Sequence, residues 1–139
     1  MEEKENKMNK TFQLVCVRHG ESVWNKDNRF CGWVDVSLSE NGIQEAHQAG
    51  IAIKKEKLTF DTVFTSTLKR AVLTANIILS YCDQPEPPLI KHWQLNERHY
   101  GALTGLNKAK CDNFCISFRN SFSLKKNQYT AVVKFYIGM

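Results

Sequence analysis

The sequence lacks a hydrophobic stretch that could cross a membrane, since no window of its 139 residues approaches the roughly 18 consecutive apolar residues that a spanning helix needs. The first ten residues, MEEKENKMNK, are charged from the second position and contain no apolar segment of the kind that directs secretion. We therefore expect neither a membrane protein nor a secreted one. Repeats and low-complexity tracts are also absent, and the length is that of one domain.

Long runs of like charge are missing as well. The net charge is +5 and the isoelectric point is about 9.0, but the basic residues are spread along the chain. No basic stripe or known nucleic-acid-binding module is present. The charge therefore favours small anions as partners, and we expect neither nucleic acid nor membrane lipid to bind.

The number of cysteines is odd, and no group of cysteines and histidines has the complete spacing of a metal site. An odd number of cysteines without a signal peptide indicates reduced thiols and predicts a cytoplasmic location. Cys111 and Cys115 are four residues apart, but no nearby histidine or third cysteine completes a metal site, so we expect packing roles for them. The five cysteines are Cys16, Cys31, Cys82, Cys111 and Cys115.

Strand-like and helix-like segments alternate along the chain. Short runs rich in β-branched and aromatic residues predict strands at 11–17, 60–66 and 89–95. Helical spacing of apolar residues predicts helices over 38–55 and 67–82. In the first helix Ser39 is the expected N-cap, and the expected buried face consists of Ile43, Ala46, Gly50 and Ile53. The alternation predicts a three-layer α/β fold, a mostly parallel sheet with helices on both faces.

Three chemically distinctive residues follow the three predicted strands. His19 follows the first strand, Arg70 lies in the first turn of the helix after the second, and Glu97 follows the third. Ligands of open α/β sheets bind beyond the carboxyl ends of the strands. We therefore expect these residues to converge at one edge of the sheet.

The converging residues suit phosphoryl transfer. A neutral imidazole such as that of His19 can attack phosphorus, and the guanidinium groups of Arg18 and Arg70 match phosphoryl oxygens. Glu97 is the candidate general acid and base, although nearby arginines favour its charged form. The alternatives are a basic surface turn at Arg18, a solvated helix face at Arg70 and a simple ion pair between Glu97 and Arg98.

Several motifs together resemble one family. The segments RHGESVWN, NRFCGWVD, LSENG, FTSTLKRA and LNERHYGALTGLNK, in this order, are similar to the cofactor-dependent phosphoglycerate mutases of the histidine phosphatase superfamily. The resemblance covers residues 11 to about 110. It implies a disordered tail at 1–10, a phosphoglycerate mutase-like α/β domain at 11–110 and a divergent tail of uncertain structure at 111–139.

The resemblance also implies roles for individual residues. His19 would carry the phosphoryl group, and Glu97 would exchange protons with the substrate hydroxyls. The resemblance implies 2,3-bisphosphoglycerate as the primer of His19, phosphoglycerates as substrates in glycolysis, no metal, and a possible homo-oligomer. The implied substrate-binding residues are Arg18, Ser22, Asn25, Cys31, Gly32, Arg70, Arg98, Tyr100 and Lys108.

Gly32 bears on the subfamily. The related bisphosphoglycerate synthases typically carry serine at this position, so glycine favours the mutase. A bisphosphoglycerate mutase or phosphatase stays open as the alternative.

The resemblance ends after Lys110. Family members continue through an arginine pair and a later strand that ends in a second catalytic histidine followed by Gly-Asn, and none of the four histidines here fills that role. We therefore expect this chain to be an impaired catalyst, or a non-catalytic protein that binds a phosphorylated metabolite. In the tail, residues 129–137 have strand-like composition, and Phe114, Phe118 and Phe122 fall on one helical face.

Overall fold

The computed structural model describes residues 13–111 and the backbone of 132–137. Its strands are β1 (Gln13–Arg18), β2 (Thr62–Thr65), β3 (Leu89–Lys91) and β4 (Val132–Ile137). Its α-helices are α1 (Val23–Lys26), α2 (Glu40–Lys55) and α3 (Lys69–Leu79). Three short 3-10 helices follow β3: η1 (Trp93–Leu95), η2 (Gly101–Leu103) and η3 (Ala109–Cys111).

The four strands form one sheet in the order β1-β4-β2-β3. β2 and β3 pair in parallel with α3 as the crossover, which is a βαβ unit. β1 runs in the same direction as β2, because each pairs antiparallel with β4. The α/β class is confirmed, and the first three strands share one direction as predicted.

β4 lies inside the sheet rather than at an edge. Its residue Phe135 is opposite Val15 of β1 and opposite Val63 of β2, so the strand bridges the two. The strand-like composition of 129–137 therefore corresponds to a real strand. β4 belongs to the segment 111–139 that the sequence separates as a divergent tail, and that division into domains stays a prediction.

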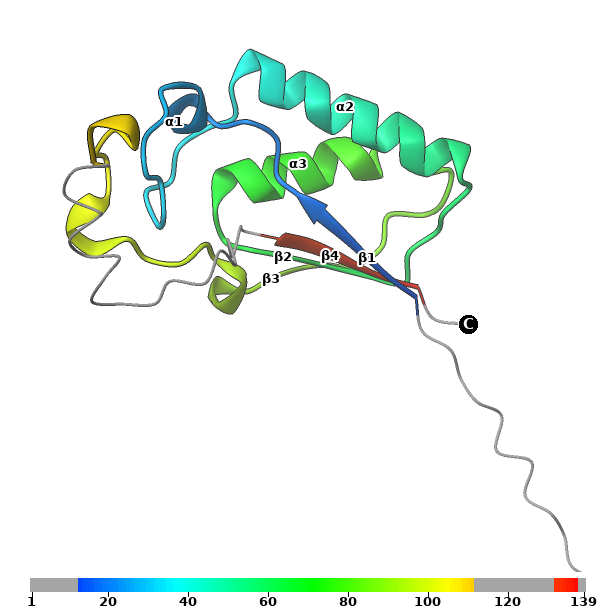
Figure 1. The fold of residues 1–139 in the computed structure, drawn as a ribbon. Helices are drawn as coiled ribbons and strands as arrows, with labels where there is room; N and C mark the ends of the chain where they lie inside the picture. Colours follow the sequence, from blue (N-terminus) through cyan, green and yellow to red (C-terminus); the bar gives the residue numbers. More distant parts are fainter. Residues whose placement is uncertain (1–12, 112–131, 138–139) are drawn as a thin grey trace, which may run out of the picture.

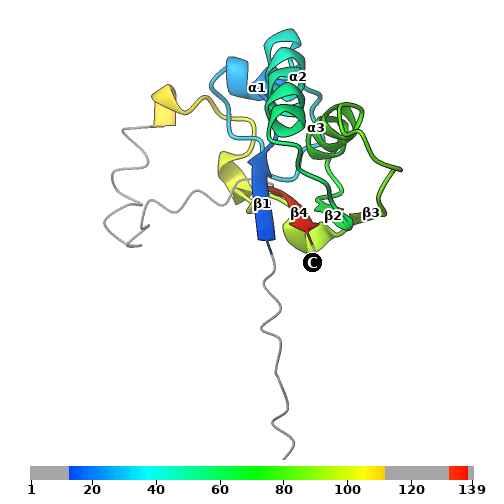
Figure 2. The ribbon, with the colours of Figure 1, turned by 90° about the vertical axis from the view of Figure 1, so that its right-hand side faces the viewer.

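Both long helices, α2 and α3, cover the same face of the sheet, as Figures 1 and 2 show, whereas we predicted helices on both faces. The core lies between this face and the helices, and α2 and α3 also pack on each other. Burying a valine, leucine, isoleucine or phenylalanine side chain of this core contributes roughly 1.5–3 kcal/mol to stability. The buried core residues are Ile53, Phe60, Val63, Leu68, Ala71, Ala75, Ile78 and Leu79.

The helices begin and end close to the predicted positions. Ser39 caps α2 as expected, because its side chain accepts a hydrogen bond from the Gly42 N–H. The predicted buried face is correct for Ala46, Gly50 and Ile53 but wrong for Ile43, which is 36% exposed. Gly42 is buried in its place, because the chain after β1 passes directly over it.

The third predicted strand is too long. β3 ends at Lys91, and the His92 N–H donates the last hydrogen bond to the Thr65 carbonyl. The chain then turns into η1, where Trp93 is exposed, so the residues after His92 do not continue the ladder. Cys111 is buried, in line with a packing role.

Some expectations lie outside the described residues. These are the tail at 1–10, the helical face of Phe114, Phe118 and Phe122, and the packing of Cys115. In the described part of the chain, no helix combines the length and the apolar character needed to cross a membrane.

The contact between Gly20 and Gly42 generates a stability prediction. A Cβ atom at Gly42 would collide with the Glu21 carbonyl, and one at Gly20 would collide with the Gly42 carbonyl. Backbone cannot yield as a flexible side chain can, so Gly42→Ala should lower the free energy of unfolding by about 1–3 kcal/mol. Urea denaturation measures this, with Gln44→Ala at an exposed position of α2 as the control. Equal stability of the two variants would show that the contact is not tight.

Candidate active site

His19 stands where β1 ends and the chain turns towards α1. Gly20 lets this turn lie against the first turn of α2, because no side chain separates its backbone from Gly42. This close packing explains why a glycine follows the histidine. It places His19 directly after the carboxyl end of β1, and Figure 1 shows the chain running from this strand end to α1.

Both ring nitrogens of His19 have defined partners. Nδ1 lies 2.6 Å from the Gly20 carbonyl oxygen, and Nε2 lies 3.1 Å from Nε of Arg70. A carbonyl only accepts and an arginine nitrogen only donates, so the proton sits on Nδ1 and Nε2 carries the lone pair. The side chain is 5% exposed. The site therefore presents a neutral imidazole with an unprotonated Nε2.

The electrostatic surroundings hold His19 in this neutral form. Burial, the largest cause, together with the positive charges of Arg70 and Arg18, lowers the pKa of His19 from 6.5 to about 4, although the hydrogen bond to Gly20 acts in the opposite direction. The ring is therefore unprotonated at neutral pH without any bound ligand. A nucleophilic role needs this state.

Arg70 is fully buried and uses all three guanidinium nitrogens. Nε donates to His19, Nη1 donates to the Val34 carbonyl at 3.0 Å, and Nη2 donates to the Gly32 carbonyl at 2.8 Å. The same Nη2 forms an ion pair of 2.9 Å with Glu97. The alternative of a solvated helix face at Arg70 is therefore wrong. These bonds hold the planar group beside the His19 ring.

Glu97 is oriented from three sides. Its Oε2 pairs with Arg70, its Oε1 accepts from the Tyr100 hydroxyl at 2.9 Å, and its backbone carbonyl accepts from the Trp33 indole at 2.7 Å. The ion pair of Glu97 is thus with Arg70 rather than with Arg98. The Arg98 guanidinium instead stacks on the Tyr100 ring at 4.7 Å. Burial raises the pKa of Tyr100, which keeps its hydroxyl a proton donor.

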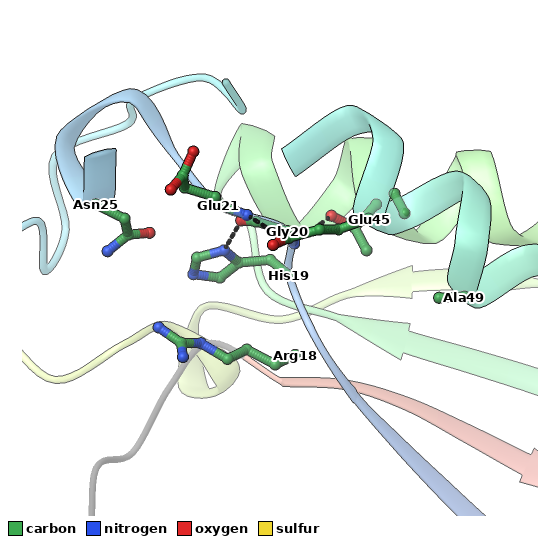
Figure 3. A pocket seen from close by; sticks show the side chains of 9 residues that line it. Arg18, His19, Gly20, Glu21, Asn25, Glu45 and Ala49 are labelled. Carbon is green, nitrogen blue, oxygen red and sulfur yellow. Dashed lines mark hydrogen bonds between the residues drawn. The ribbon is translucent and has the colours of Figure 1, made fainter. Parts of the chain in front are cut away.

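An open cavity of about 470 Å³ lies beside His19 (Figure 3). In Figure 3 the imidazole lies between Arg18 on one side and Glu21 on the other, with Asn25 beyond the ring. Arg18 makes no hydrogen bond or ion pair within residues 13–111, so its charge is available to an anion. The lining residues are Arg18, His19, Gly20, Glu21, Asn25, Glu45, Ala46, Ala49 and Thr74.

Glu45 and Thr74 line this cavity, and sequence reasoning missed both. Glu45 accepts from the Glu21 N–H at 2.8 Å, and Thr74 accepts from the Gly20 N–H at 3.2 Å. A signal for Thr74 existed, because it follows Arg70 by one helical turn on the same face of α3. No comparable pattern marks Glu45.

Ser22, Asn25 and Cys31 form a connected group near the cavity. The Ser22 hydroxyl donates to Asn25 Oδ1 at 2.8 Å, accepts from the Asn25 N–H and lies 3.5 Å from the Cys31 sulfur. The bond from the Asn25 N–H, together with a 3.1 Å bond from the Ser22 N–H to Asn25 Oδ1, forms a capping box at the start of α1. Of the three, Asn25 reaches the cavity. Ser22 and Cys31 are buried behind it and hold the turn in place.

Gly32 and Lys108 lie outside the lining of the His19 cavity. Gly32 has a φ of +54° and gives its carbonyl to Arg70, with the Tyr100 ring packed close to its Cα. The Lys108 ammonium lies 5.7 Å from the centre of the Phe30 ring. Its backbone N–H donates to the Asn28 carbonyl and ties the loop after η2 to the loop after α1.

Comparison with known proteins adds a family and a named relative. The sequence model of the histidine phosphatase superfamily (branch 1) matches residues 14–130, beyond the point at which the motifs end. A 2,3-bisphosphoglycerate-dependent phosphoglycerate mutase of Treponema denticola is 59% identical over 99 residues. That match covers 71% of this chain and 40% of the relative, so the chain spans less than half the relative's length.

Solved structures share the fold. A phosphoglycerate mutase of Bacillus anthracis is 27% identical with a TM-score of 0.63, covering 78% of this chain and 47% of that one. A phosphoserine phosphatase of Entamoeba histolytica, in complex with 3-phosphoglyceric acid, is 26% identical with a TM-score of 0.65. This match covers 84% of the chain described here and 54% of the phosphoserine phosphatase chain.

The lowered pKa of His19 predicts how stability depends on pH. The folded state holds this ring neutral down to about pH 4, whereas the unfolded chain protonates it near 6.5. The contribution of neutral His19 to the free energy of unfolding is therefore complete above pH 6.5. It is lost as the pH falls towards 4, by about 3 kcal/mol in total. Unfolding of wild type and His19→Gln across this range isolates the effect. The stability difference between them should shrink with falling pH, and a constant difference would contradict the assignment.

Proposed function

Because the chain belongs to the histidine phosphatase superfamily (branch 1), we propose that it transfers phosphoryl groups through His19 as a phosphoglycerate mutase. The proposed reaction interconverts 3-phosphoglycerate and 2-phosphoglycerate, with 2,3-bisphosphoglycerate as primer. The observation that carries the proposal is the buried, neutral His19 whose Nε2 faces the Arg70 guanidinium. The Treponema denticola relative, named as a mutase of this kind, supports the choice of substrate.

In the proposed reaction Nε2 of His19 attacks phosphorus, and the bond between phosphorus and the departing oxygen breaks. The Gly20 carbonyl holds the ring proton on Nδ1, so Nε2 keeps a lone pair. In the free chain this lone pair accepts the Arg70 Nε–H, and it attacks phosphorus when that hydrogen bond passes to a phosphoryl oxygen. The hydrogen bond to the Gly20 carbonyl also stabilises the positive charge that develops on the ring. His19 then holds the phosphoryl group until an acceptor hydroxyl takes it.

The two arginines act on the charge of the phosphoryl group. Arg70 donates to Nε2 in the free chain, and the same N–H lies where an oxygen of a group on Nε2 would accept it. Arg18 adds a second cation from the cavity side. Phosphoryl transfer depends mainly on positioning and charge stabilisation, so pre-positioned guanidinium groups supply much of the catalysis.

Glu97 is the proposed general acid and base. It is the carboxylate that touches the Arg70 guanidinium, which places it close to the phosphoryl site. Tyr100 donates to its second oxygen, so the carboxyl orientation is set before substrate binds. In this role Glu97 gives a proton to the departing oxygen and takes one from the attacking hydroxyl.

The residues present fit 2,3-bisphosphoglycerate in their donor chemistry. The guanidinium of Arg18, which has no hydrogen-bond or ion-pair partner among residues 13–111, lines the cavity together with His19, and this suits a phosphoryl group. When bound, the compound supplies the phosphoryl group that primes His19. Arg18 and Arg70 would hold that group, and Asn25 would line the same cavity.

Gly32 favours the mutase over the bisphosphoglycerate synthase. A Cβ at this position would lie 3.0 Å from the Tyr100 ring, and the positive φ is strained for any other residue. A serine would therefore disturb the loop that gives its carbonyl to Arg70.

The four described cysteines are free thiols, which supports the proposed cytoplasmic location.

The direct test of the proposal is phosphorylation of His19. We expect purified chain incubated with 2,3-bisphosphoglycerate to gain one acid-labile phosphoryl group, located on His19 by mass spectrometry. His19→Gln should gain none, and His47→Gln, at an exposed position of α2, should behave as wild type.

Two outcomes would count against the proposal. A folded wild-type chain without label rejects catalysis. If the compound nevertheless raises the melting temperature of that chain, the non-catalytic binding protein replaces the mutase.

A second prediction concerns Glu97. Glu97→Gln keeps the size and the hydrogen-bonding shape of the side chain but cannot move a proton. The rate of His19 phosphorylation should fall by about 10²–10⁴, the usual contribution of general acid–base catalysis. Rapid-quench measurement of phosphorylation gives the rate, with Glu86→Gln as an exposed control. An unchanged rate would remove Glu97 from the proposed mechanism.

A further inference from the structure

A closed ring of hydrogen bonds connects His19, Gly20, Arg70 and Thr74. The Gly20 N–H donates to the Thr74 hydroxyl at 3.2 Å, and that hydroxyl donates to the Arg70 carbonyl at 2.8 Å. Nε of Arg70 donates to Nε2 of His19, whose Nδ1 donates to the Gly20 carbonyl. Each group is buried, so none of these bonds competes freely with water.

The Thr74 hydroxyl does more than a helical threonine usually does. Threonine in a helix commonly donates to the carbonyl four residues earlier, and Thr74 does so to Arg70. Here the same oxygen also accepts from Gly20, 54 residues away in the sequence. It therefore joins the chain segment that carries the nucleophile to the helix that carries the guanidinium.

We propose that Thr74 is a positioning residue, whose hydroxyl fixes the Gly20 peptide groups so that the Gly20 carbonyl keeps the His19 proton on Nδ1. This inference rests on the proposed function, because it assigns the tautomer that phosphoryl transfer through Nε2 requires. Thr74 acts through Gly20 and His19 and needs no contact with the phosphoryl group.

The physical reason lies in the freedom of glycine. Gly20 has no side chain to restrict its backbone, so its orientation depends on the groups that bind it. The Thr74 hydroxyl holds its N–H, and Glu45 holds the next N–H, that of Glu21. Removing the hydroxyl leaves a buried N–H without a partner, and rotation of the segment would relieve that cost.

Rotation of Gly20 would turn its carbonyl away from Nδ1. Only the Arg70 Nε–H, which donates to Nε2, would then oppose transfer of the ring proton to Nε2, and the Nε2–H form cannot attack phosphorus. Loss of the Thr74 hydroxyl should therefore appear as a change of tautomer at His19. A threonine that serves helix stability alone would leave the tautomer unchanged.

The experiment compares wild type with Thr74→Val, which keeps the shape of the side chain, and Thr74→Ser, which keeps the hydroxyl. Long-range ¹H–¹⁵N correlation spectra of ¹⁵N-histidine-labelled protein, recorded at neutral pH, report the tautomer of His19. We expect the Nδ1–H form in wild type and Thr74→Ser, and a mixture of the two tautomers in Thr74→Val. The rate of His19 phosphorylation by 2,3-bisphosphoglycerate should fall about tenfold in Thr74→Val and stay within about twofold in Thr74→Ser.

An unchanged Nδ1–H tautomer in folded Thr74→Val overturns the proposal, as does an Nε2–H tautomer in wild type. Should Thr74→Val not fold, hydrogen exchange of the Gly20 amide decides. Slow exchange in wild type and Thr74→Ser supports the bond to the hydroxyl, and fast exchange in wild type overturns it. Absence of phosphorylation in wild type together with the expected tautomer change rejects the proposed function while the role of Thr74 stands.

Discussion

The hydrogen bond from Arg70 to Nε2 of His19 is the contact on which the site depends. It joins the end of β1 to the first turn of α3, two elements that meet only because the sheet and the helix layer are assembled. A guanidinium buried this completely requires a partner for each nitrogen: Nε donates to His19, Nη1 donates to the Val34 carbonyl, and Nη2 donates to the Gly32 carbonyl and to Glu97. The same partners fix the guanidinium where a phosphoryl group would need it.

Close backbone packing makes this contact possible. Gly20 and Gly42 let the segment after β1 lie against the start of α2, and Gly32 adopts a left-handed conformation that aims its carbonyl at Arg70. Burial then lowers the pKa of His19 and keeps the ring neutral. The charge state of the site thus follows from packing: small residues bring the backbone close, this closeness excludes water, and the exclusion of water keeps His19 neutral.

Sequence reasoning predicted the α/β class and brought His19, Arg70 and Glu97 to one edge of the sheet, because alternating strands and helices restrict where strand ends meet. It did not predict the central place of β4 or the early end of β3, which depend on pairing between distant segments. It also missed Glu45 and Thr74. Their hydrogen bonds to the Glu21 and Gly20 backbone join residues far apart in the sequence, and no periodic pattern of residues marks such a bond. Long-range hydrogen bonds of this kind become visible only in the assembled fold.

A crystal structure of the chain with orthovanadate, which mimics a phosphoryl group in transfer, tests most directly whether Nε2 of His19 accepts a phosphoryl group. We expect vanadium bonded to Nε2 of His19, with its oxygens accepting hydrogen bonds from the guanidinium groups of Arg70 and Arg18. Two results would contradict phosphoryl transfer through His19: vanadate bound away from His19, or a fully occupied complex in which Nε2 of His19 still accepts the hydrogen bond from Arg70.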